Sequence, residues 1–388
     1  MIANVPSATL LGVEGQAVGV EVHVSNGLPG FTIVGLPDTA CREARDRVRA
    51  AFLSTDLAWP LKRTTVNLAP SSVRKAGSGT DLAIAVALLV AAGEVPPEAV
   101  EGYGFLGELG LDGSVRPVRG MVPLARAVSC LRLVVPAGAP EVARAAGDRE
   151  VQTVQRLAEV VDALRKDQPW PDPPPVPPPA PRPPGPDLAD VRGQRVGRWA
   201  VEVAAAGGHH LLLTGPPGSG KTMLARRLPG LLPDLTAEEA LEATCVHSAA
   251  GLPLPGGIVE HPPFRAPHHG ASAVSLIGGG STWMRPGEMS LAHRGVMFLD
   301  EVGEFPAQVL DQLRQPLEEG VVRVARARAS VTFPARFLLV AAMNPCPCGE
   351  GGPPGSCRCT DAARARYRRR LSGPLLDRFD LRVPVARP

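Results

Sequence analysis

The chain has 388 residues, too many for one ordinary domain, and 44% of them are hydrophobic, enough for more than one core. Its 41 Lys and Arg residues nearly balance 38 Asp and Glu, and the formal net charge of +3 excludes a histone-like coat of positive charge. Any nucleic-acid contact must come from local basic patches. There is no run of about 18 apolar residues and no basic N-terminal region with a cleavage site, so neither a membrane span nor a signal peptide is predicted.

Cysteine usage indicates the compartment. Seven cysteines are an odd number, and four of them crowd into residues 346–359. This pattern is typical of a reducing compartment rather than of a disulfide framework. We therefore expect a cytoplasmic protein without membrane contact.

A proline-rich tract, DQPWPDPPPVPPPAPRPPGPD at residues 167–187, marks a boundary. Such a tract favours polyproline II and predicts a semi-rigid spacer. A ligand for a proline-recognising domain is the alternative. The tract divides the chain into a first half, residues 1–166, and a second half, residues 188–388.

Short β-like runs alternate with Ala-rich helical runs in the first half, which predicts an α/β domain. The predicted elements in chain order are strands at 17–26 and 30–36, a helix at 38–55, a strand at 64–70, a helix at 81–93 and a hairpin within 103–118. The hairpin is expected to turn at Asp112 and Gly113, a pair that favours tight turns.

The second half also alternates strands and helices. The predicted elements are a helix at 196–208, a strand at 209–215, a helix at 221–232, a strand at 295–301, a helix at 307–320 and a strand at 336–344. This order predicts a parallel, doubly wound sheet.

A glycine-rich loop lies between the first strand and the second helix of this half. It fits the pattern G-x-x-x-x-G-K-[ST] with the residues Gly215, Pro216, Pro217, Gly218, Ser219, Gly220, Lys221 and Thr222. Backbone N–H groups of such a loop and the helix N-terminus bind phosphate oxygens. Lys221 is expected to neutralise the β- and γ-phosphates of ATP, and the Thr222 hydroxyl to ligate Mg²⁺. The alternative is a turn with a solvated lysine, but Lys221 is the one lysine after residue 166 in an arginine-rich segment.

Polar residues end two later strands. Asp300 and Glu301 follow an apolar run, at the strand end where ligands of open α/β sheets bind. Asp300 suits the Mg²⁺ shell, and Glu301 suits polarisation of the attacking water. Asn344 follows the strand at 336–344 and is expected to orient that water or sense the γ-phosphate; a plain turn residue is the alternative.

The chain contains several longer motifs: GFTIVGLPDTACREARDRVRAA, TVNLAP, GFLGELGLDGSVRPVRG, GPPGSGKT, FRAPHH, RPGEMSLAHRGVMFLDE, LRQPLEEG, AAMNPCPCG and LSGPLLDRFDL. Together they resemble the Mg-chelatase-like AAA+ family that includes YifB and ComM. The resemblance covers the chain from about residue 4 onward. It implies an AAA+ core in residues 188–388, a Lon-protease-like fold for residues 1–166, and a ring-forming ATPase, with a hexamer expected. In ComM-type proteins it implies a DNA branch-migration motor of natural transformation.

The resemblance also implies roles and departures. Arg378 resembles the arginine finger that a neighbouring subunit supplies, with a surface arginine paired to Asp377 or Asp380 as the alternative. Gln194 resembles the family's entry to the adenine pocket. The family continues beyond LLDRFDL with a helical lid, whereas this sequence stops at Pro388, so we expect the lid to be missing and hydrolysis to be impaired.

The Lon-like half is predicted to be inactive as a protease. Gly77 stands where the serine nucleophile of Lon proteases is expected, and Val122 stands at the lysine position. Ser78 and Lys75 form a nearby pair, but Lys75 is expected to be solvated on a loop. A scaffold or partner-binding role is expected instead.

Two further sets of residues have candidate roles. Cys346, Cys348, Cys357 and Cys359 form C-x-C-x₈-C-x-C, which fits a tetrahedral Zn²⁺ site, with free thiols or a redox pair as alternatives. Alternating Val and Arg at 321–331 predict a strand with one basic face, where Arg323, Arg326 and Arg328 would follow single-stranded or branched DNA. A solvated strand face is the alternative for these arginines. His268 and His269 lie in an insertion at about 236–295 and are expected in a packed or substrate-facing loop, with a metal site as the alternative.

Three functions remain open from the sequence. The first is an ATP-driven motor on DNA, and the second is a magnesium-chelatase-type ATPase subunit that drives metal insertion. The third is a nucleotide-dependent binding module with little turnover.

Overall fold

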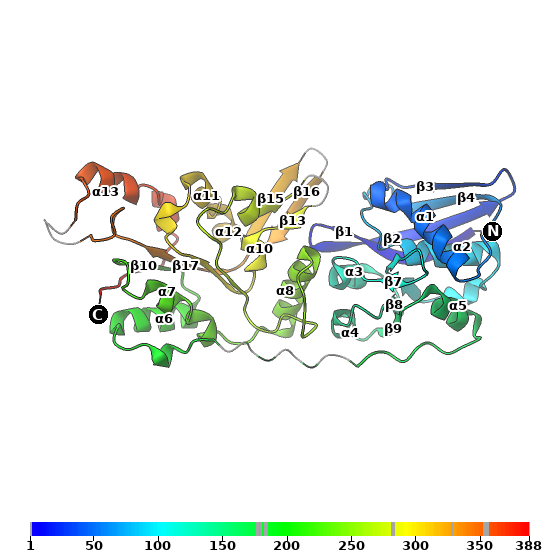
Figure 1. Cartoon of the computed structure of the whole chain (residues 1–388), viewed down its shortest axis with the longest axis horizontal. Helices are drawn as coiled ribbons and strands as arrows, with labels where there is room; N and C mark the ends of the chain where they lie inside the picture. Colours follow the sequence, from blue (N-terminus) through cyan, green and yellow to red (C-terminus); the bar gives the residue numbers. More distant parts are fainter. Residues whose placement is uncertain are drawn as a thin grey trace. The chain divides into compact units, whose positions relative to one another are not determined.

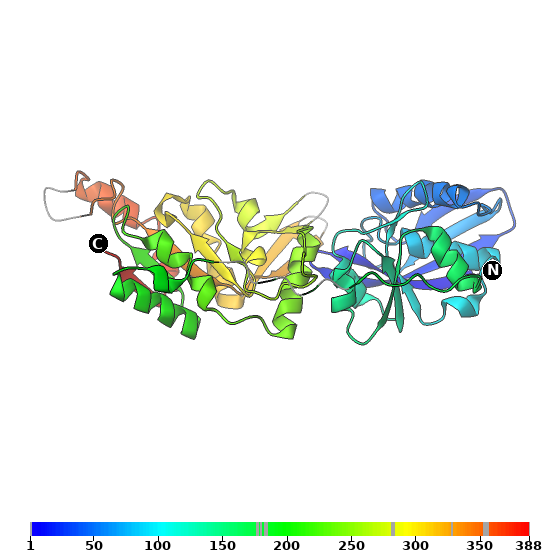
Figure 2. The same ribbon diagram turned by 60° about the horizontal axis from the view of Figure 1, so that its bottom comes forward.

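The computed structural model describes residues 2–175, 178, 181, 185–280, 284–326, 329–351 and 357–387, with the backbone alone at residues 326 and 329. The chain divides into two units, residues 1–180 with 247–258 and residues 181–246 with 259–388, which are drawn in Figures 1 and 2. Across the described ranges, no helix combines the length and the apolar content needed to cross a membrane.

The first unit contains a four-stranded sheet in the order β1-β2-β4-β3. Its strands are β1 (Ile2–Leu11), β2 (Glu14–Ser25), β3 (Gly30–Val34) and β4 (Arg63–Ala69). β2 pairs antiparallel with both β1 and β4, whereas β3 runs parallel to β4. The three predicted strands are confirmed, and β1 is a strand that the sequence pattern did not predict.

Both predicted helices of the first unit are present, as α1 (Thr39–Ser54) and α2 (Asp81–Ala92). The Asp38 carboxylate begins α1 by accepting the backbone N–H of Cys41 at 2.8 Å. α2 contacts β1 and β2 and is buried on nearly all sides, which explains its continuous apolar sequence.

The other elements of the first unit follow in chain order. They are η1 (Pro97–Val100), β5 (Tyr103–Phe105), β6 (Glu108–Leu109), β7 (Val115–Arg116), α3 (Met121–Ala127), β8 (Arg132–Pro136), α4 (Glu141–Ala145), β9 (Glu150–Val154) and α5 (Leu157–Arg165). β5, β8 and β9 form a parallel sheet. β6 and β7 pair antiparallel around Asp112 and Gly113, which confirms the predicted hairpin.

A buried ion pair joins the two main helices of this unit. Arg47 of α1 donates from Nε to Asp81 Oδ2 at 2.6 Å and from an Nη atom to Asp81 Oδ1 at 3.0 Å. The Asp81 side chain is fully buried, and burial raises the pKa of this carboxyl to about 6 against the opposing effect of Arg47. The backbone N–H of Leu109 also donates to Asp81, at 3.3 Å.

The second unit is built on a five-stranded sheet in the order β11-β14-β17-β10-β18. Its strands are β10 (Leu211–Thr214), β11 (Phe264–Arg265), β14 (Val296–Leu299), β17 (Leu338–Met343) and β18 (Leu381–Pro384). Every pairing in the sheet is parallel, which confirms the predicted architecture. The carboxyl ends of β14, β17 and β10 therefore meet at one edge of the sheet.

Both faces of this sheet are buried, as is typical of parallel sheets. Alternate residues of its central strands, such as Leu211, Phe298 and Val340, form a core with α6 (Arg195–Gly207) and α7 (Lys221–Ala225). Figure 1 shows α6 and α7 on one side of β10 and β17, with α11 (Ala307–Asp311) and α12 (Arg314–Glu319) on the other.

Two predicted helices of the second half are interrupted, each near a proline. The helix expected at 221–232 ends after α7 and is followed by the 3-10 turn η3 (Leu228–Leu231), which contains Pro229. The helix expected at 307–320 divides into α11 and α12. Pro316 lies in the first turn of α12, where its missing N–H has no intrahelical partner to lose.

The remaining elements are shorter. They are η2 (Leu188–Asp190), α8 (Ala237–Ala250), α9 (Ala273–Ile277), β12 (Gly278–Gly279), β13 (Arg285–Pro286), α10 (Glu288–Leu291), η4 (Val302–Glu304), the antiparallel hairpin of β15 (Val321–Arg326) and β16 (Ala329–Pro334), α13 (Asp361–Arg368) and α14 (Gly373–Leu376). α8 begins in the second unit, and its last residues belong to the first.

Candidate functional site

The glycine-rich loop connects β10 to α7 at the carboxyl edge of the sheet. Gly215 passes so close to another backbone segment that a Cβ there would lie 2.1 Å from the Val385 carbonyl oxygen. Gly218 and Gly220 have φ angles of +77° and +91°, which L side chains rarely adopt. The chain can therefore curl here only with glycine at these three positions.

Lys221 lies under this loop and is largely buried. Its Nζ donates to the carbonyl oxygens of Gly215 at 2.7 Å and Pro216 at 2.9 Å, and to Oδ1 of Asn344 at 3.3 Å. Burial lowers the pKa of the ammonium group, while the negative charges of Asp300 and Glu301 oppose that shift. The structure thus brings the predicted loop lysine and the predicted strand-end amide into direct contact.

A hydroxyl and a carboxylate meet beside the lysine. Thr222 Oγ1 donates to Asp300 Oδ2 at 2.9 Å, across 78 residues of sequence. Asp300 directly follows β14, and its other oxygen accepts the N–H of Glu301 at 3.0 Å. Hard oxygen donors of this kind are the ligands that Mg²⁺ prefers.

Glu301 has an uncommon backbone conformation, with φ of +49°. Its carboxylate is about half exposed and lies 3.7 Å from Nδ1 of His269. The rings of His268 and His269 are in contact, and His269 also packs against Phe305. The sequence pattern predicts only that this histidine pair lies in a loop and does not predict its position beside Glu301, because the contact joins segments 32 residues apart.

Comparisons with known proteins agree with this geometry. The model of the family "Magnesium chelatase, subunit ChlI" matches residues 187–388, and "Subunit ChlI of Mg-chelatase" matches residues 20–138. YifB of Escherichia coli (strain K12) is 44% identical over 395 residues, which cover 100% of this chain and 76% of YifB. Competence protein ComM of Haemophilus influenzae is 45% identical over 390 residues, which cover 99% of this chain and 76% of ComM.

The chain belongs to the Mg-chelatase-like AAA+ ATPase family. More distantly, the magnesium-chelatase 38 kDa subunit of Cereibacter sphaeroides is 28% identical over 192 residues, covering 46% of this chain and 51% of that subunit. The similarity to YifB and ComM thus includes both units, whereas the similarity to the chelatase subunit extends over less than half of the chain.

Gln194 lies next to the glycine-rich loop. It directly precedes α6, and its Nε2 donates to the carbonyl oxygens of Ser219 at 3.0 Å and Ala386 at 2.6 Å. The residue thus ties the start of α6 to the loop and to the segment after β18. A role at the adenine pocket stays a prediction.

Arg378 pairs with Glu318 of α12 rather than with Asp377 or Asp380. Asp377 instead faces Arg382 at 3.5 Å, and Asp380 accepts the backbone N–H of His210 at 2.8 Å. The alternative of a local pair with a neighbouring aspartate is therefore wrong. In the family, an arginine here is expected to act on the next subunit, and its half-exposed side chain is compatible with that prediction.

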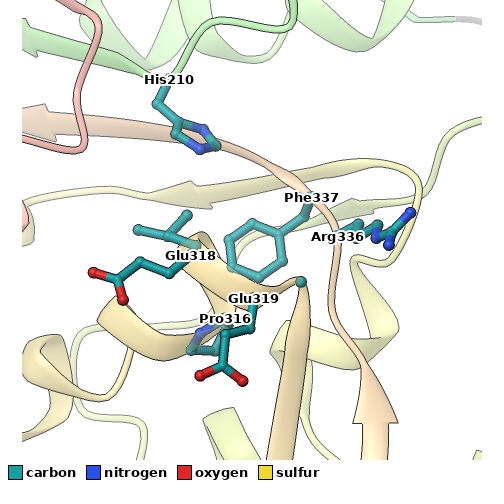
Figure 3. A pocket seen from close by; sticks show the side chains of 8 residues that line it. His210, Pro316, Glu318, Glu319, Arg336 and Phe337 are labelled. Carbon is teal, nitrogen blue, oxygen red and sulfur yellow. The ribbon is translucent and has the colours of Figure 1, made fainter.

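A cavity of about 290 Å³ lies at the opposite edge of the sheet from the glycine-rich loop. His210 and Phe337, which line it, directly precede β10 and β17. Figure 3 shows the Phe337 ring between His210 and α12, with Glu318 on the same helix. This cavity therefore belongs to the side of Arg378 and not to the side of Lys221.

The segment before Arg378 is fixed to the loop that follows Glu301. Tyr367 of α13 is buried over Gly303, where a Cβ would lie 2.5 Å from the tyrosine ring. Arg370 donates to the Gly303 carbonyl oxygen, and to Glu304 at 3.0 Å. The loop after Glu301 therefore packs against α13 and the residues that follow this helix.

In the first unit, Ser78 and Lys75 each donate to another partner. Lys75 is fully buried, and its Nζ donates to the Pro70 carbonyl oxygen, so the expectation of a solvated lysine is wrong. Ser78 donates instead to Glu108. The Lon-like fold, with Gly77 and Val122 at the nucleophile and lysine positions, stays a prediction, and so does inactivity as a protease.

The remaining predicted residues are the arginines of the basic strand and the four clustered cysteines. Arg323 is exposed on β15 and pairs with Glu319, whereas Arg328 and the Arg326 side chain lie outside the described residues. The hairpin of β15 and β16 confirms the predicted strand. The four clustered cysteines converge.

Proposed function

We propose that this protein is an ATP-hydrolysing motor that acts on DNA as a homo-oligomeric ring. The observation that carries the proposal is the meeting of Lys221, Thr222, Asp300 and Asn344 at the carboxyl ends of three adjacent parallel strands. Ligands of open α/β sheets bind at this edge. The family to which the chain belongs is one of AAA+ ATPases.

The residues present fit ATP with Mg²⁺. The positive φ angles of Gly218 and Gly220 curl the loop, and the Thr222 hydroxyl and Asp300 carboxylate supply two hard ligands 2.9 Å apart. When bound, Mg²⁺ would neutralise charge on the phosphates. Lys221 would exchange its two loop carbonyl contacts for phosphate oxygens, because a charged acceptor binds the ammonium more strongly.

Hydrolysis would then depend on Glu301 and Asn344. Glu301 would accept a proton from the attacking water, and Asn344, which contacts Lys221 at 3.3 Å, would hold that water against the γ-phosphate. Arg378 of a neighbouring subunit would stabilise the charge that develops in the transition state. This last role requires assembly, which supports a ring, and a hexamer is the number we propose.

DNA is the proposed substrate because one relative that matches both units is named a competence protein. Arg323 on the exposed face of β15 supplies a local cation for a phosphate backbone. We propose branch migration on single-stranded or branched DNA during natural transformation, in the cytoplasm. A chelatase-type role is less favoured, since the chelatase subunit matches only 46% of the chain.

The test measures ATP binding and hydrolysis by the full chain, with and without forked DNA. We expect native hydrolysis to rise with DNA, Lys221→Ala to lose binding, and Glu301→Gln to bind ATP without turnover. Lys166→Ala is the matched control, because Lys166 is an exposed lysine at the end of α5. Folded native protein that retains no ATP with Mg²⁺ would refute the proposal.

Two other outcomes select the alternatives. Turnover that is indifferent to DNA would favour a chelatase-type ATPase. ATP binding with no turnover under any of these conditions would favour a nucleotide-dependent binding module.

A further inference from the structure

Four cysteine thiols converge just after β17. Cys346 Sγ lies 3.3 Å from Cys348 Sγ and 3.5 Å from Cys357 Sγ, and Cys348 Sγ lies 3.6 Å from Cys357 Sγ. With Cys359 included, all four sulfur atoms lie within 4.8 Å of one another. Two sequence segments, 346–348 and 357–359, thus direct their thiols to one point.

These separations distinguish between a disulfide and a metal site. A disulfide would bring two sulfurs to about 2.0 Å, far closer than any pair here. Four thiolates at about 2.3 Å from a central Zn²⁺ ion would lie about 3.8 Å from each other in a tetrahedron. The observed separations of 3.3 to 3.6 Å are close to that value. Soft thiolates in a set of four select zinc or an iron–sulfur centre over Mg²⁺.

We propose that Cys346, Cys348, Cys357 and Cys359 bind one Zn²⁺ ion in a closed structural site. Four protein ligands leave no position for water, so the ion would stabilise the fold and take no part in catalysis. Zinc is favoured over an iron–sulfur cluster because a cluster needs its cysteines farther apart, around several iron atoms, whereas these sulfurs lie close enough together to bind one ion.

The backbone turns tightly at the first cysteine pair, and we call this turn, residues 346–349, the knuckle. Gly349 donates its N–H to the Cys346 carbonyl oxygen at 3.0 Å and has a φ angle of +83°. Only glycine adopts this conformation without strain. The turn thus holds the Cys346 and Cys348 thiols on the same side.

This knuckle also touches the glycine-rich loop. Gly349 packs against Pro217, where a Cβ would lie 2.7 Å from the proline ring. Arg387 reinforces the contact by donating to the Pro217 carbonyl oxygen at 3.2 Å and by facing Glu350 at 3.5 Å. The metal would therefore brace the outer side of the loop, and this part of the inference rests on the proposed nucleotide site.

The test is the metal content of full-length protein purified under reducing conditions without a chelator. We expect about one zinc per chain, and loss of zinc in Cys348→Ser and Cys357→Ser. Cys130→Ser is the matched control, because Cys130 is a partly buried thiol outside the cluster, and it should retain zinc. Native protein without zinc, or variants that retain the full amount, would overturn the proposal.

Cobalt substitution covers the case in which the serine variants do not fold. Native chain grown with Co²⁺ should show the thiolate-to-metal charge-transfer absorption of a tetrahedral site with four sulfurs, and absence of these bands would also overturn it. An iron–sulfur chromophore would do the same. Zinc retained by a protein that does not bind ATP would refute the proposed function and leave the zinc site intact.

Discussion

Replacement of Arg47 by methionine should strongly destabilise the first unit. Arg47 makes both charged hydrogen bonds to Asp81, at 2.6 and 3.0 Å, and leaves that carboxylate with one backbone donor when it is removed. Methionine keeps much of the apolar stem, so the loss is mainly that of the charge. Breaking a buried pair in this way costs about 3–5 kcal/mol.

The raised pKa of Asp81 predicts how this loss of stability depends on pH. Burial raises the pKa of Asp81 to about 6 in the folded protein, above its value of about 4 in the unfolded chain. As pH rises through the range between these two pKa values, such a carboxyl progressively lowers the free energy of unfolding, because it ionises more readily in the unfolded chain than in the folded protein. Without Arg47 the pKa of Asp81 rises further. The deficit of Arg47→Met should therefore be largest near neutral pH and should shrink below about pH 6, where Asp81 is protonated with or without Arg47.

Native-state hydrogen exchange of the α2 amides in the full chain measures this loss. A deficit of 3–5 kcal/mol corresponds to exchange about 100- to 4,000-fold faster once intrinsic rates are corrected. Arg45→Met is the control on the same helix, since Arg45 pairs with Asp46 at 2.9 Å with both side chains more than half exposed. It should leave the exchange of the α2 amides close to that of the native chain, because exposed ion pairs contribute little to stability. Equal losses in the two variants, or an Arg47→Met deficit that is the same at pH 5.5 and 7.5, would refute the reasoning.

Two further predictions concern Arg378 and the buried Lys75. Arg378→Ala should keep ATP binding but lower turnover by about 1,000-fold or more. Mixing it with Lys221→Ala should restore part of the activity, because one variant supplies the nucleotide site and the other supplies the arginine. Arg382→Ala, at a nearby arginine, is the control, and a loss of ATP binding in Arg378→Ala would contradict a role in the neighbouring subunit. Lys75→Met should leave stability at neutral pH unchanged or higher, since it removes a buried ammonium. Burial lowers the pKa of Lys75, so the native chain should gain stability as pH rises toward 10.5, and urea unfolding of the variant should lack that gain.

Local patterns predicted most of the second unit because its signals are contained in short segments. The glycine-rich loop requires a strand before it and a helix after it, and the apolar runs that end at Asp300 and Asn344 can be satisfied only inside a parallel sheet. The contact of Thr222 with Asp300 follows from that topology, since the loop that leads to Thr222 leaves the carboxyl end of β10 and Asp300 follows the carboxyl end of β14. The ring, the lid and the chemical roles of these residues stay predictions.

Where prediction failed, distant contacts or prolines decided the outcome. β1 contains Pro6, which argues against a central strand, but β1 lies at the edge of its sheet, where a missing N–H is tolerated. Lys75 was expected in water because a lysine on a loop usually is, whereas the fold encloses it and supplies the Pro70 carbonyl. His269 approaches Glu301 only after folding, and the sequence holds no local record of that contact.

The packing of Tyr367 over Gly303 has a consequence for communication between subunits. The ring closes directly on the backbone two residues after Glu301, with no spare volume for even a methyl group. A shift of the loop after Glu301 on phosphate release would push the Tyr367 ring and, with it, the segment between Tyr367 and Arg378. In the proposed ring, each subunit would thereby transmit its own nucleotide state to Arg378, the proposed finger for its neighbour.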